Sequence, residues 1–399
     1  MKKFLLCDKV QPYQKKSTRG DGKMDTIFRH DSDFENGRKF YQGTLCIVDL
    51  KGSFFEMGRQ YGALLRNELE KVYRFACANQ DGFKYLGCLG GSNTTVCGFR
   101  KYDEFFRGMS ETSELSLEQL LAVNAVEVIY LDLIAKGMGS MFDASRCSTL
   151  AANGSLTENG NSVIGRNYDW LPEFEEIADT LVLTVFHPSD GSNAVASFNW
   201  TGCLYMTTGL NSAGIYMGLN SGMFADKNAC PERIHNVWML WEMLWNCSDL
   251  DTVKRCFNTF RSAAGYLIMG ASARETECFQ WHTQGMWFPA PRSGNGDLIA
   301  AANHFASSEW KNDPLAEDDT IASSVQRREN LLSLAKKYSR ITSVEMMELL
   351  SVPYAEGGAK VRGTMFQIVT DVQEKIWYVR TCLMNEWACV PLADLLNDR

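Results

Sequence analysis

The sequence contains no hydrophobic run long enough to cross a bilayer. The nearest candidate, residues 121–133, falls short of the roughly 20 apolar residues that a spanning helix needs, and it predicts a buried helix. The N-terminal segment Met1–Asp8 starts like a secretory signal, but its apolar stretch is too short and ends at Asp8. We expect a protein without a membrane span, located in the cytoplasm, with secretion left open if a signal has been removed.

The cysteines are not arranged as in disulfide-rich or zinc-binding proteins. There are 13 of them, an odd number, with no Cys-x-x-Cys pair and no tight cluster with the five histidines. This spacing supports neither a disulfide framework nor a structural metal site. Apart from Cys147, we expect most of them to be small buried hydrophobic residues.

Basic clusters, phosphate-binding glycine loops and flexible linkers are also missing. The formal net charge is −8, so a nucleic acid is not an expected partner. No cofactor or metal is predicted, and the expected partner is a small-molecule substrate, with a homo-oligomer left open. No Pro/Gly/Ser-rich segment and no repeat divides the chain, and 45% hydrophobic residues suffice for a sizeable core. We therefore expect one domain.

Residues 147–170 carry the clearest chemical signal. Apolar and β-branched residues flank Asn153-Gly154 and Asn159-Gly160, pairs that are typical of tight turns. We predict a hairpin that returns Arg166 and Asp169 to the side of Cys147. Arg166 would favour the thiolate, and Asp169 would hold or orient a nearby amine, an arrangement suited to acyl transfer. The alternative is a strand that ends in a solvated turn, with Arg166 and Asp169 paired at the surface.

Periodicity predicts alternating blocks of helices and strands. Helices are expected over 54–75, 116–136, 234–245, 250–260, 321–337 and 343–350, and strands over 179–186, 194–200, 203–208, 214–219, 266–270, 276–282, 298–302, 365–371 and 375–380. Residues 1–40 are polar and are expected to form a surface arm. Two blocks of strands separated by helices suit two stacked antiparallel sheets covered by helices.

Six segments in order resemble one known family. They are residues 51–62, with a Gly-x-x-x-Glu-x-Gly-x-x-x-Gly pattern, then 147–170, 208–220, 302–305, 324–327 and 364–381. Together they resemble the cysteine-type N-terminal nucleophile (Ntn) hydrolases, in particular the penicillin acyltransferase family and its relatives, the choloylglycine hydrolases and acid ceramidases. The likeness covers about residues 45–382. One departure is Arg146, where family members often carry glycine.

The resemblance implies an α+β fold, the four-layer αββα sandwich of two antiparallel sheets covered by helices. It also implies autocatalytic cleavage before Cys147, which divides the chain into a mostly helical pro-segment, 1–146, and a catalytic core, 147–399. The freed residue then supplies both the thiol and an α-amine, whose ordinary pKa of about 7.7–8.0 suits a base at neutral pH.

The resemblance places further residues at the site. Asn220 and Asn303 would stabilise the oxyanion through their side-chain amides, although each asparagine taken alone is a common turn residue. Arg327 would be a cation near the site, whereas the alternative is an exposed helix arginine, and the adjacent Arg328 makes the register ambiguous. His304 is expected to be structural. Aromatic residues would line an acyl pocket or simply fill the core: Tyr168, Trp170, Trp200, Trp281 and Trp287.

Three functions remain open at this stage. The first is a self-processing amidohydrolase that cleaves a linear N-acyl amide, with a neutral or apolar acyl group, through a thioester. The second is an acyltransferase that passes the acyl group to an amine. The third is an unprocessed binding protein of the same fold. A papain-like protease is less favoured, because the Cys-Gly-x-Cys-Trp setting is absent around Cys147.

Overall fold

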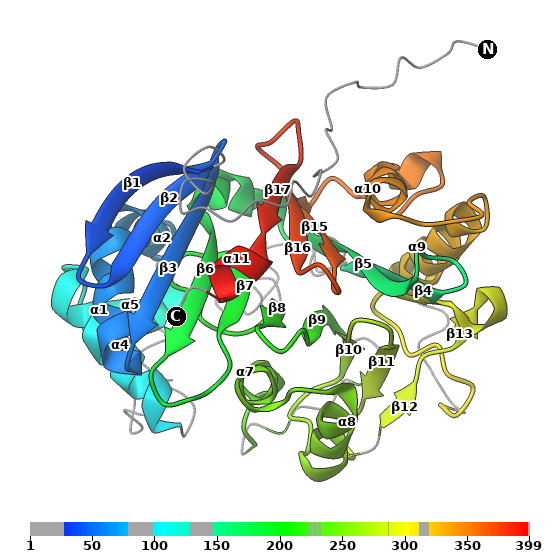
Figure 1. Cartoon of the computed structure of the whole chain (residues 1–399), viewed down its shortest axis with the longest axis horizontal. Coiled ribbons are helices and arrows are strands. Elements are labelled where there is room, and N and C mark those ends of the chain that lie inside the picture. Colours follow the sequence, from blue (N-terminus) through cyan, green and yellow to red (C-terminus); the bar gives the residue numbers. More distant parts are fainter. Residues whose placement is uncertain are drawn as a thin grey trace.

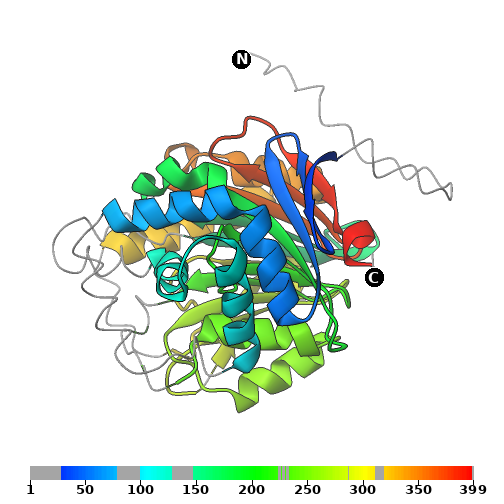
Figure 2. The ribbon, with the colours of Figure 1, turned by 90° about the vertical axis from the view of Figure 1, so that its left-hand side faces the viewer.

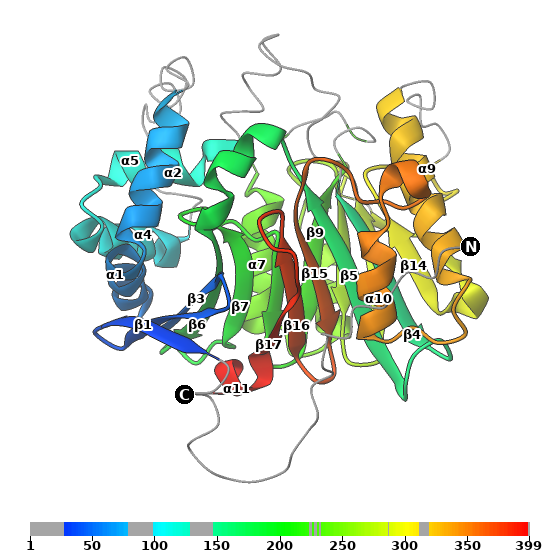
Figure 3. The ribbon, with the colours of Figure 1, turned by 90° about the horizontal axis from the view of Figure 1, so that it is seen from above.

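Two β-sheets and two groups of helices form the described part of the chain. The computed structural model describes residues 28–78, 99–127, 147–222, 226, 230, 233–285, 287–310 and 319–397. In Figures 1 and 3 the helices lie on the outer sides of the sheets. The order of layers is helix, sheet, sheet, helix, which confirms the expected α+β class and αββα arrangement.

The larger sheet has ten strands and the smaller has seven. In spatial order the larger sheet contains β1 (Arg29–Phe34), β2 (Gly37–Gln42), β3 (Leu45–Gly52), β6 (Leu181–Pro188), β7 (Val195–Trp200), β8 (Thr208–Asn211), β9 (Tyr216–Ser221), β10 (Tyr266–Ala271), β11 (Thr276–Trp281) and β12 (Trp287–Pro289). The smaller contains β13 (Arg292–Ser293), β14 (Leu298–Ala301), β4 (Ser148–Gly154), β5 (Gly160–Asp169), β15 (Thr364–Asp371), β16 (Ile376–Thr381) and β17 (Ala388–Pro391). Strands such as β6, β7 and β10 are buried along almost their whole length, because both faces of each sheet are covered.

Helices cover the outer face of each sheet. Those on the larger sheet's side are α1 (Phe54–Leu64), α2 (Arg66–Ala78), α4 (Arg100–Thr112), α5 (Leu117–Asn124), α7 (Asn236–Asn246) and α8 (Leu250–Thr259). The first four face the viewer in Figure 2, where they are blue to cyan. On the smaller sheet, α9 (Asp319–Ala335) packs on β14 and β4, and α10 (Ser343–Ser351) packs on β5 and β15. The short α11 (Leu392–Leu396) and three 3₁₀ turns, Pro172–Thr180, Gly294–Gly296 and Tyr354–Glu356, complete the described elements.

Segments from both sides of Cys147 share the larger sheet. Strand β3 lies upstream of Cys147 and pairs in parallel with β6, which lies downstream, from Cys46 opposite Val182 to Gly52 opposite Pro188. Cleavage at residue 147 would therefore leave two fragments joined by a continuous hydrogen-bonded sheet.

Three expectations from periodicity are wrong in detail. Residues 29–42, expected within a polar arm, form β1 and β2, whose residues are packed beside β3. The helix expected over 54–75 is interrupted at Leu65, between α1 and α2. The strand expected at 203–208 is displaced, since β8 begins only at Thr208. Part of the helix expected at 116–136 lies outside the described residues.

The glycines of the 51–62 motif allow α1 and α4 to touch. Ser53 caps α1 and forms a capping box with Glu56. A Cβ atom on Gly58 would lie 2.1 Å from the main-chain oxygen of Phe105 in α4, and one on Gly108 would lie 2.1 Å from that of Phe55. The motif is therefore required for backbone contact between these helices.

Replacing Gly58 by alanine should destabilise the protein. Alanine normally favours a helix over glycine by roughly 1 kcal/mol, but here the new methyl group meets main-chain atoms that cannot move independently. We expect a net loss of about 1–3 kcal/mol in the free energy of unfolding, measured by urea titration. Ser110→Ala, on the same pair of helices, is the control and should change stability by less than about 0.5 kcal/mol. An unchanged or higher stability of Gly58→Ala would contradict the close packing.

Among the helices that the structure describes, none is long and apolar enough to cross a membrane.

Candidate active site

Cys147 lies at the start of the predicted hairpin. Strands β4 and β5 pair antiparallel, with Ser148 opposite Asn167 and Thr149 opposite Arg166. The turn uses left-handed backbone conformations at Gly154, Asn159 and Gly160, as the asparagine and glycine residues there predict. The hairpin is confirmed, and Cys147 is buried.

Arg166 contacts the thiol. Its Nη2 lies 3.6 Å from Sγ of Cys147 and also donates to the main-chain oxygen of Leu219, while its Nη1 donates to Oγ1 of Thr208 over 3.0 Å. Both Arg166 and Asp169 are buried. The alternative of a surface ion pair in a solvated turn is therefore wrong.

Burial dominates the ionisation of the thiol in the continuous chain. It raises the pKa of Cys147, while the charges of Arg166 and Arg327 and a hydrogen bond from the main-chain N–H of Asp169 lower it, and the charge of Asp169 raises it. The direction is upward, so the thiol is protonated at neutral pH in this arrangement.

Arg327 holds the main chain at Cys147 and lies beside Asp169. Oδ1 of Asp169 accepts from Oγ1 of Thr364 over 2.6 Å, and Oδ2 lies 3.9 Å from Nη1 of Arg327. The same Nη1 donates to the main-chain oxygen of Cys147 over 3.0 Å. Arg327 is buried rather than exposed on its helix, and Arg328 instead donates to the main-chain oxygen of Ala300.

The two asparagines lie on adjoining segments. Asn303 Oδ1 accepts from Nη2 of Arg327 over 3.0 Å, and its Nδ2 donates to the main-chain oxygen of Ser221. Asn220 accepts from Thr149 and donates to the main-chain oxygens of Ala301 and Ala302 over 3.4 and 3.2 Å. Both amides bind main-chain carbonyls in this arrangement, so either would have to turn to reach an oxyanion.

Glu127 is a buried carboxyl that the sequence analysis did not single out. Its Oε1 accepts from the hydroxyl of Tyr168 and, over 2.9 Å, from Nε1 of Trp200, and its Oε2 accepts from the hydroxyl of Tyr205. The available signal was an acidic residue inside the mostly apolar run 121–133, which also contains Asp132, because a charge is buried there only with partners.

Replacing Glu127 by glutamine should change how stability depends on pH. Burial raises the pKa of this carboxyl from 4.5, against hydrogen bonds from Tyr168, Tyr205 and Trp200 and the charge of Arg166. A carboxyl whose pKa is raised by folding contributes fully to the free energy of unfolding below about pH 4.5. This contribution is lost as the pH rises through the pKa of the carboxyl in the folded protein. The free energy of unfolding of Glu127→Gln minus that of wild type should therefore increase above this pH. Urea titrations at several pH values test this, and a constant difference would contradict it.

The other expected residues are structural in this arrangement. Nδ1 of His304 bonds Oγ of Ser324 over 2.8 Å, and burial lowers its pKa to about 4. Of the aromatic residues considered for an acyl pocket, Trp287 is half-buried and the other four are buried in the core. Within the described residues no group of three or more His, Cys, Asp or Glu side chains could hold a metal ion.

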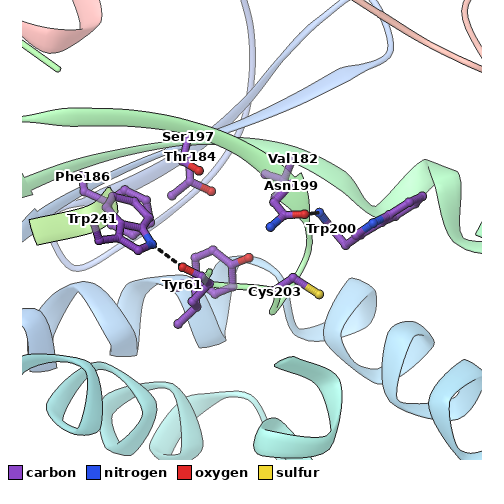
Figure 4. A pocket seen from close by; sticks show the side chains of 10 residues that line it. Tyr61, Val182, Thr184, Phe186, Ser197, Asn199, Trp200, Cys203 and Trp241 are labelled. Carbon is purple, nitrogen blue, oxygen red and sulfur yellow. Dashed lines mark hydrogen bonds between the residues drawn. The ribbon is translucent and has the colours of Figure 1, made fainter. Parts of the chain in front are cut away.

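A small cavity lies elsewhere, between α1, the larger sheet and α7 (Figure 4). It encloses about 10 Å³, roughly the space of one water molecule, and Tyr61, Ser197 and Trp241 are among its lining residues. None of the six expected catalytic residues lines it. Trp200 lies at its edge and connects it to Glu127 through the indole N–H.

Several solved structures are similar to this chain at low sequence identity. An ortholog of N-acylethanolamine-hydrolyzing acid amidase from Caenorhabditis elegans shares 14% identity, with a TM-score of 0.42, over 57% of this chain and 93% of that one. A mutant of conjugated bile acid hydrolase from Clostridium perfringens shares 11%, with a TM-score of 0.40, over 63% and 95%. Penicillin V acylase from Agrobacterium tumefaciens shares 13%, with a TM-score of 0.38, over 63% and 89%. At this level of similarity nothing about activity follows.

The search of curated proteins found no match to the sequence. A family model described as acyl-coenzyme A:6-aminopenicillanic acid acyl-transferase matches residues 155–383, more than half of the chain, beginning after Cys147. The expected resemblance to the penicillin acyltransferase family is confirmed, and the chain belongs to this acyltransferase family.

Proposed function

We propose that the chain is a self-processing cysteine amidohydrolase that cleaves the C–N bond of a linear N-acyl amide through a thioester on Cys147. The observation that carries the proposal is the buried arrangement around Cys147. Its thiol lies 3.6 Å from a guanidinium nitrogen of Arg166, and its main-chain oxygen is held by Arg327. Membership of an acyltransferase family supports chemistry at an acyl carbon.

Processing begins within the chain. Sγ of Cys147 attacks the carbonyl carbon of Arg146, the C–N bond between the two residues breaks, and the acyl group moves to sulfur. Water hydrolyses this thioester, which frees the carboxylate of Arg146 and leaves Cys147 with a thiol and an α-amine. Arg146 lies outside the described residues, and its bulky side chain is expected to slow the first step relative to glycine.

Catalysis then uses the new amine as the base. The α-amine of Cys147 takes the thiol proton, Arg166 favours the resulting thiolate, and sulfur attacks the substrate carbonyl. The oxyanion accepts hydrogen bonds from the side-chain amides of Asn220 and Asn303 once these turn from main-chain carbonyls. The leaving amine takes the proton from the α-ammonium, and water, deprotonated by the same amine, hydrolyses the thioester.

The family match favours a second candidate, transfer of the acyl group to an amine instead of water. Both candidates share the same thioester and differ only in which nucleophile attacks it. The acceptor therefore decides between them.

The test is acylation of Cys147 in the processed protein. A panel of N-acyl amino acids, phenoxyacetyl amides, conjugated bile acids and aminoacyl amines is mixed with the protein, with and without an added amine, and Cys147 is analysed by peptide mass spectrometry. We expect an acyl adduct on Cys147 and free acid as product. An N-acylated acceptor amine instead of free acid would identify a transferase. Absence of any adduct would overturn the proposal in favour of a non-enzymatic binding protein of the same fold.

A further inference from the structure

The partners of Glu127 define an unusual set of groups beside the proposed nucleophile. We call Glu127, Tyr168, Trp200 and Tyr205 the Glu127 cluster. Glu127 is 5% exposed, and its three partners are all neutral donors that come from segments downstream of Cys147. Burial raises the pKa of Glu127 although these donors and the charge of Arg166 lower it, so a cation bound against the carboxyl would favour its ionised form.

In the Glu127 cluster every side-chain donor is bonded to the carboxyl, so only oxygen acceptors remain for a ligand. The hydroxyls of Tyr168 and Tyr205 and the indole N–H of Trp200 all donate to Glu127. Each phenol oxygen keeps lone pairs, and a carboxylate has about four acceptor positions, of which three are occupied. A ligand that meets this cluster therefore meets oxygen acceptors, and a cationic ligand would stabilise the charged form of Glu127.

The cluster is joined to the nucleophile by short contacts. Tyr168 follows Arg166 by two residues on β5, so both side chains lie on the same face of the strand. The guanidinium carbon of Arg166 lies 5.0 Å from the centre of the Tyr168 ring, and its Nη2 reaches Sγ of Cys147. Tyr205 is only half-buried, so the cluster extends from the thiol towards solvent.

We propose that the Glu127 cluster binds a primary ammonium group of the substrate, and that Glu127 is its specificity-determining residue. An ammonium group offers three N–H donors to Glu127 and the two phenol oxygens, and it neutralises the carboxylate. The group belongs either to the acyl part or to the amine part of the substrate. This inference rests on the proposed amidase function, and it replaces the expectation of a wholly neutral or apolar acyl group.

Two matched substrate pairs test the proposal and separate the two sources. The acyl arm compares 4-aminobutyryl and pentanoyl p-nitroanilides, and the amine arm compares hexanoyl amides of 1,4-diaminobutane and of pentylamine. Charged hydrogen bonds of this kind correspond to about a 10- to 100-fold preference in kcat/KM for the ammonium member of one pair. In Glu127→Gln the ratio should fall close to 1. Glu242→Gln is the matched control, since Glu242 also accepts from a tyrosine, Tyr102, and from Lys101, and it should keep the wild-type ratio.

A binding measurement that requires no turnover completes the design. Butylammonium chloride should raise the thermal unfolding midpoint of wild type more than the same concentration of 1-butanol, measured with sodium chloride added to the same ionic strength. This difference between the two compounds should vanish in Glu127→Gln and shrink in Tyr205→Phe. Tyr205→Phe keeps the carboxylate, and so guards against a folding defect in the glutamine variant. The inference would be overturned if wild type had the same kcat/KM for the two members of each pair, or if a preference for the ammonium member survived in Glu127→Gln. Either result would leave the amidase proposal intact. If no substrate acylates Cys147, the amidase proposal fails first, and the butylammonium result then decides whether the cluster binds ammonium at all.

Discussion

Cys147→Ala is expected to remain a single full-length chain, whereas wild type separates on a denaturing gel into residues 1–146 and 147–399. The attacking sulfur is absent in the variant, so neither cleavage nor thioester formation can occur. Turnover should fall by about 10⁴-fold or more, as when a catalytic nucleophile is removed. The measurement is denaturing electrophoresis with intact mass spectrometry after prolonged incubation.

Under native conditions the two wild-type fragments should stay together. Strand β3 of the first fragment pairs with β6 of the second, and α1 packs on this sheet. Cys278→Ala is the control, because Cys278 is also buried but lies on β11, and it should process normally. One uncleaved band for wild type would rule out an N-terminal nucleophile.

Arg166→Met should give the second largest loss. The substitution keeps an apolar stem but removes the positive charge 3.6 Å from Sγ of Cys147, and this charge lowers the pKa of the thiol. Alkylation of Cys147 by iodoacetamide at neutral pH should therefore slow by about tenfold or more, and its pH profile should move upward. Turnover should fall by about 10²-fold or more, since a preorganised charge is lost from the site.

Two further variants separate this effect from misfolding. Arg166→Lys keeps the charge and should retain part of the alkylation rate, although a lysine cannot bond Thr208 and Leu219 as the guanidinium does. Arg328→Met removes a neighbouring buried arginine that bonds Ala300, and should leave the alkylation profile in place. If Arg166→Met alkylates at Cys147 with the wild-type pH profile, the assignment of Arg166 is wrong.

Local signals predicted the hairpin and the order of most elements. The Asn-Gly pairs at 153–154 and 159–160 specify a tight turn because few other residues adopt left-handed backbone angles, and this alone returns β5 to β4. Helical spacing likewise located α7, α8 and α10 within a few residues. These features are determined by residues that are close together in the chain, so they can be predicted from local sequence.

Elements that depend on distant partners were missed or misplaced. Strand β2 pairs with the edge of β3, and the polar β1 pairs in turn with β2. The displaced start of β8 follows from its pairing with β7 and β9, where Thr208 is opposite Gly218. Neither partner can be read from local periodicity, since sheet pairing outweighs intrinsic preference.

The sequence by itself determined the chemical groups of the candidate site, the hairpin that returns Arg166 to Cys147, and the family resemblance. Tertiary structure decided which groups meet across distant segments. Arg327 rather than Arg328 reaches Cys147 because of how α9 packs on β4 and β14, and Glu127 meets Tyr168, Trp200 and Tyr205 only because upstream helices cover the larger sheet. The physical reason is that hairpin geometry is local, whereas burial of a charge depends on partners that only the packed core brings within hydrogen-bonding distance.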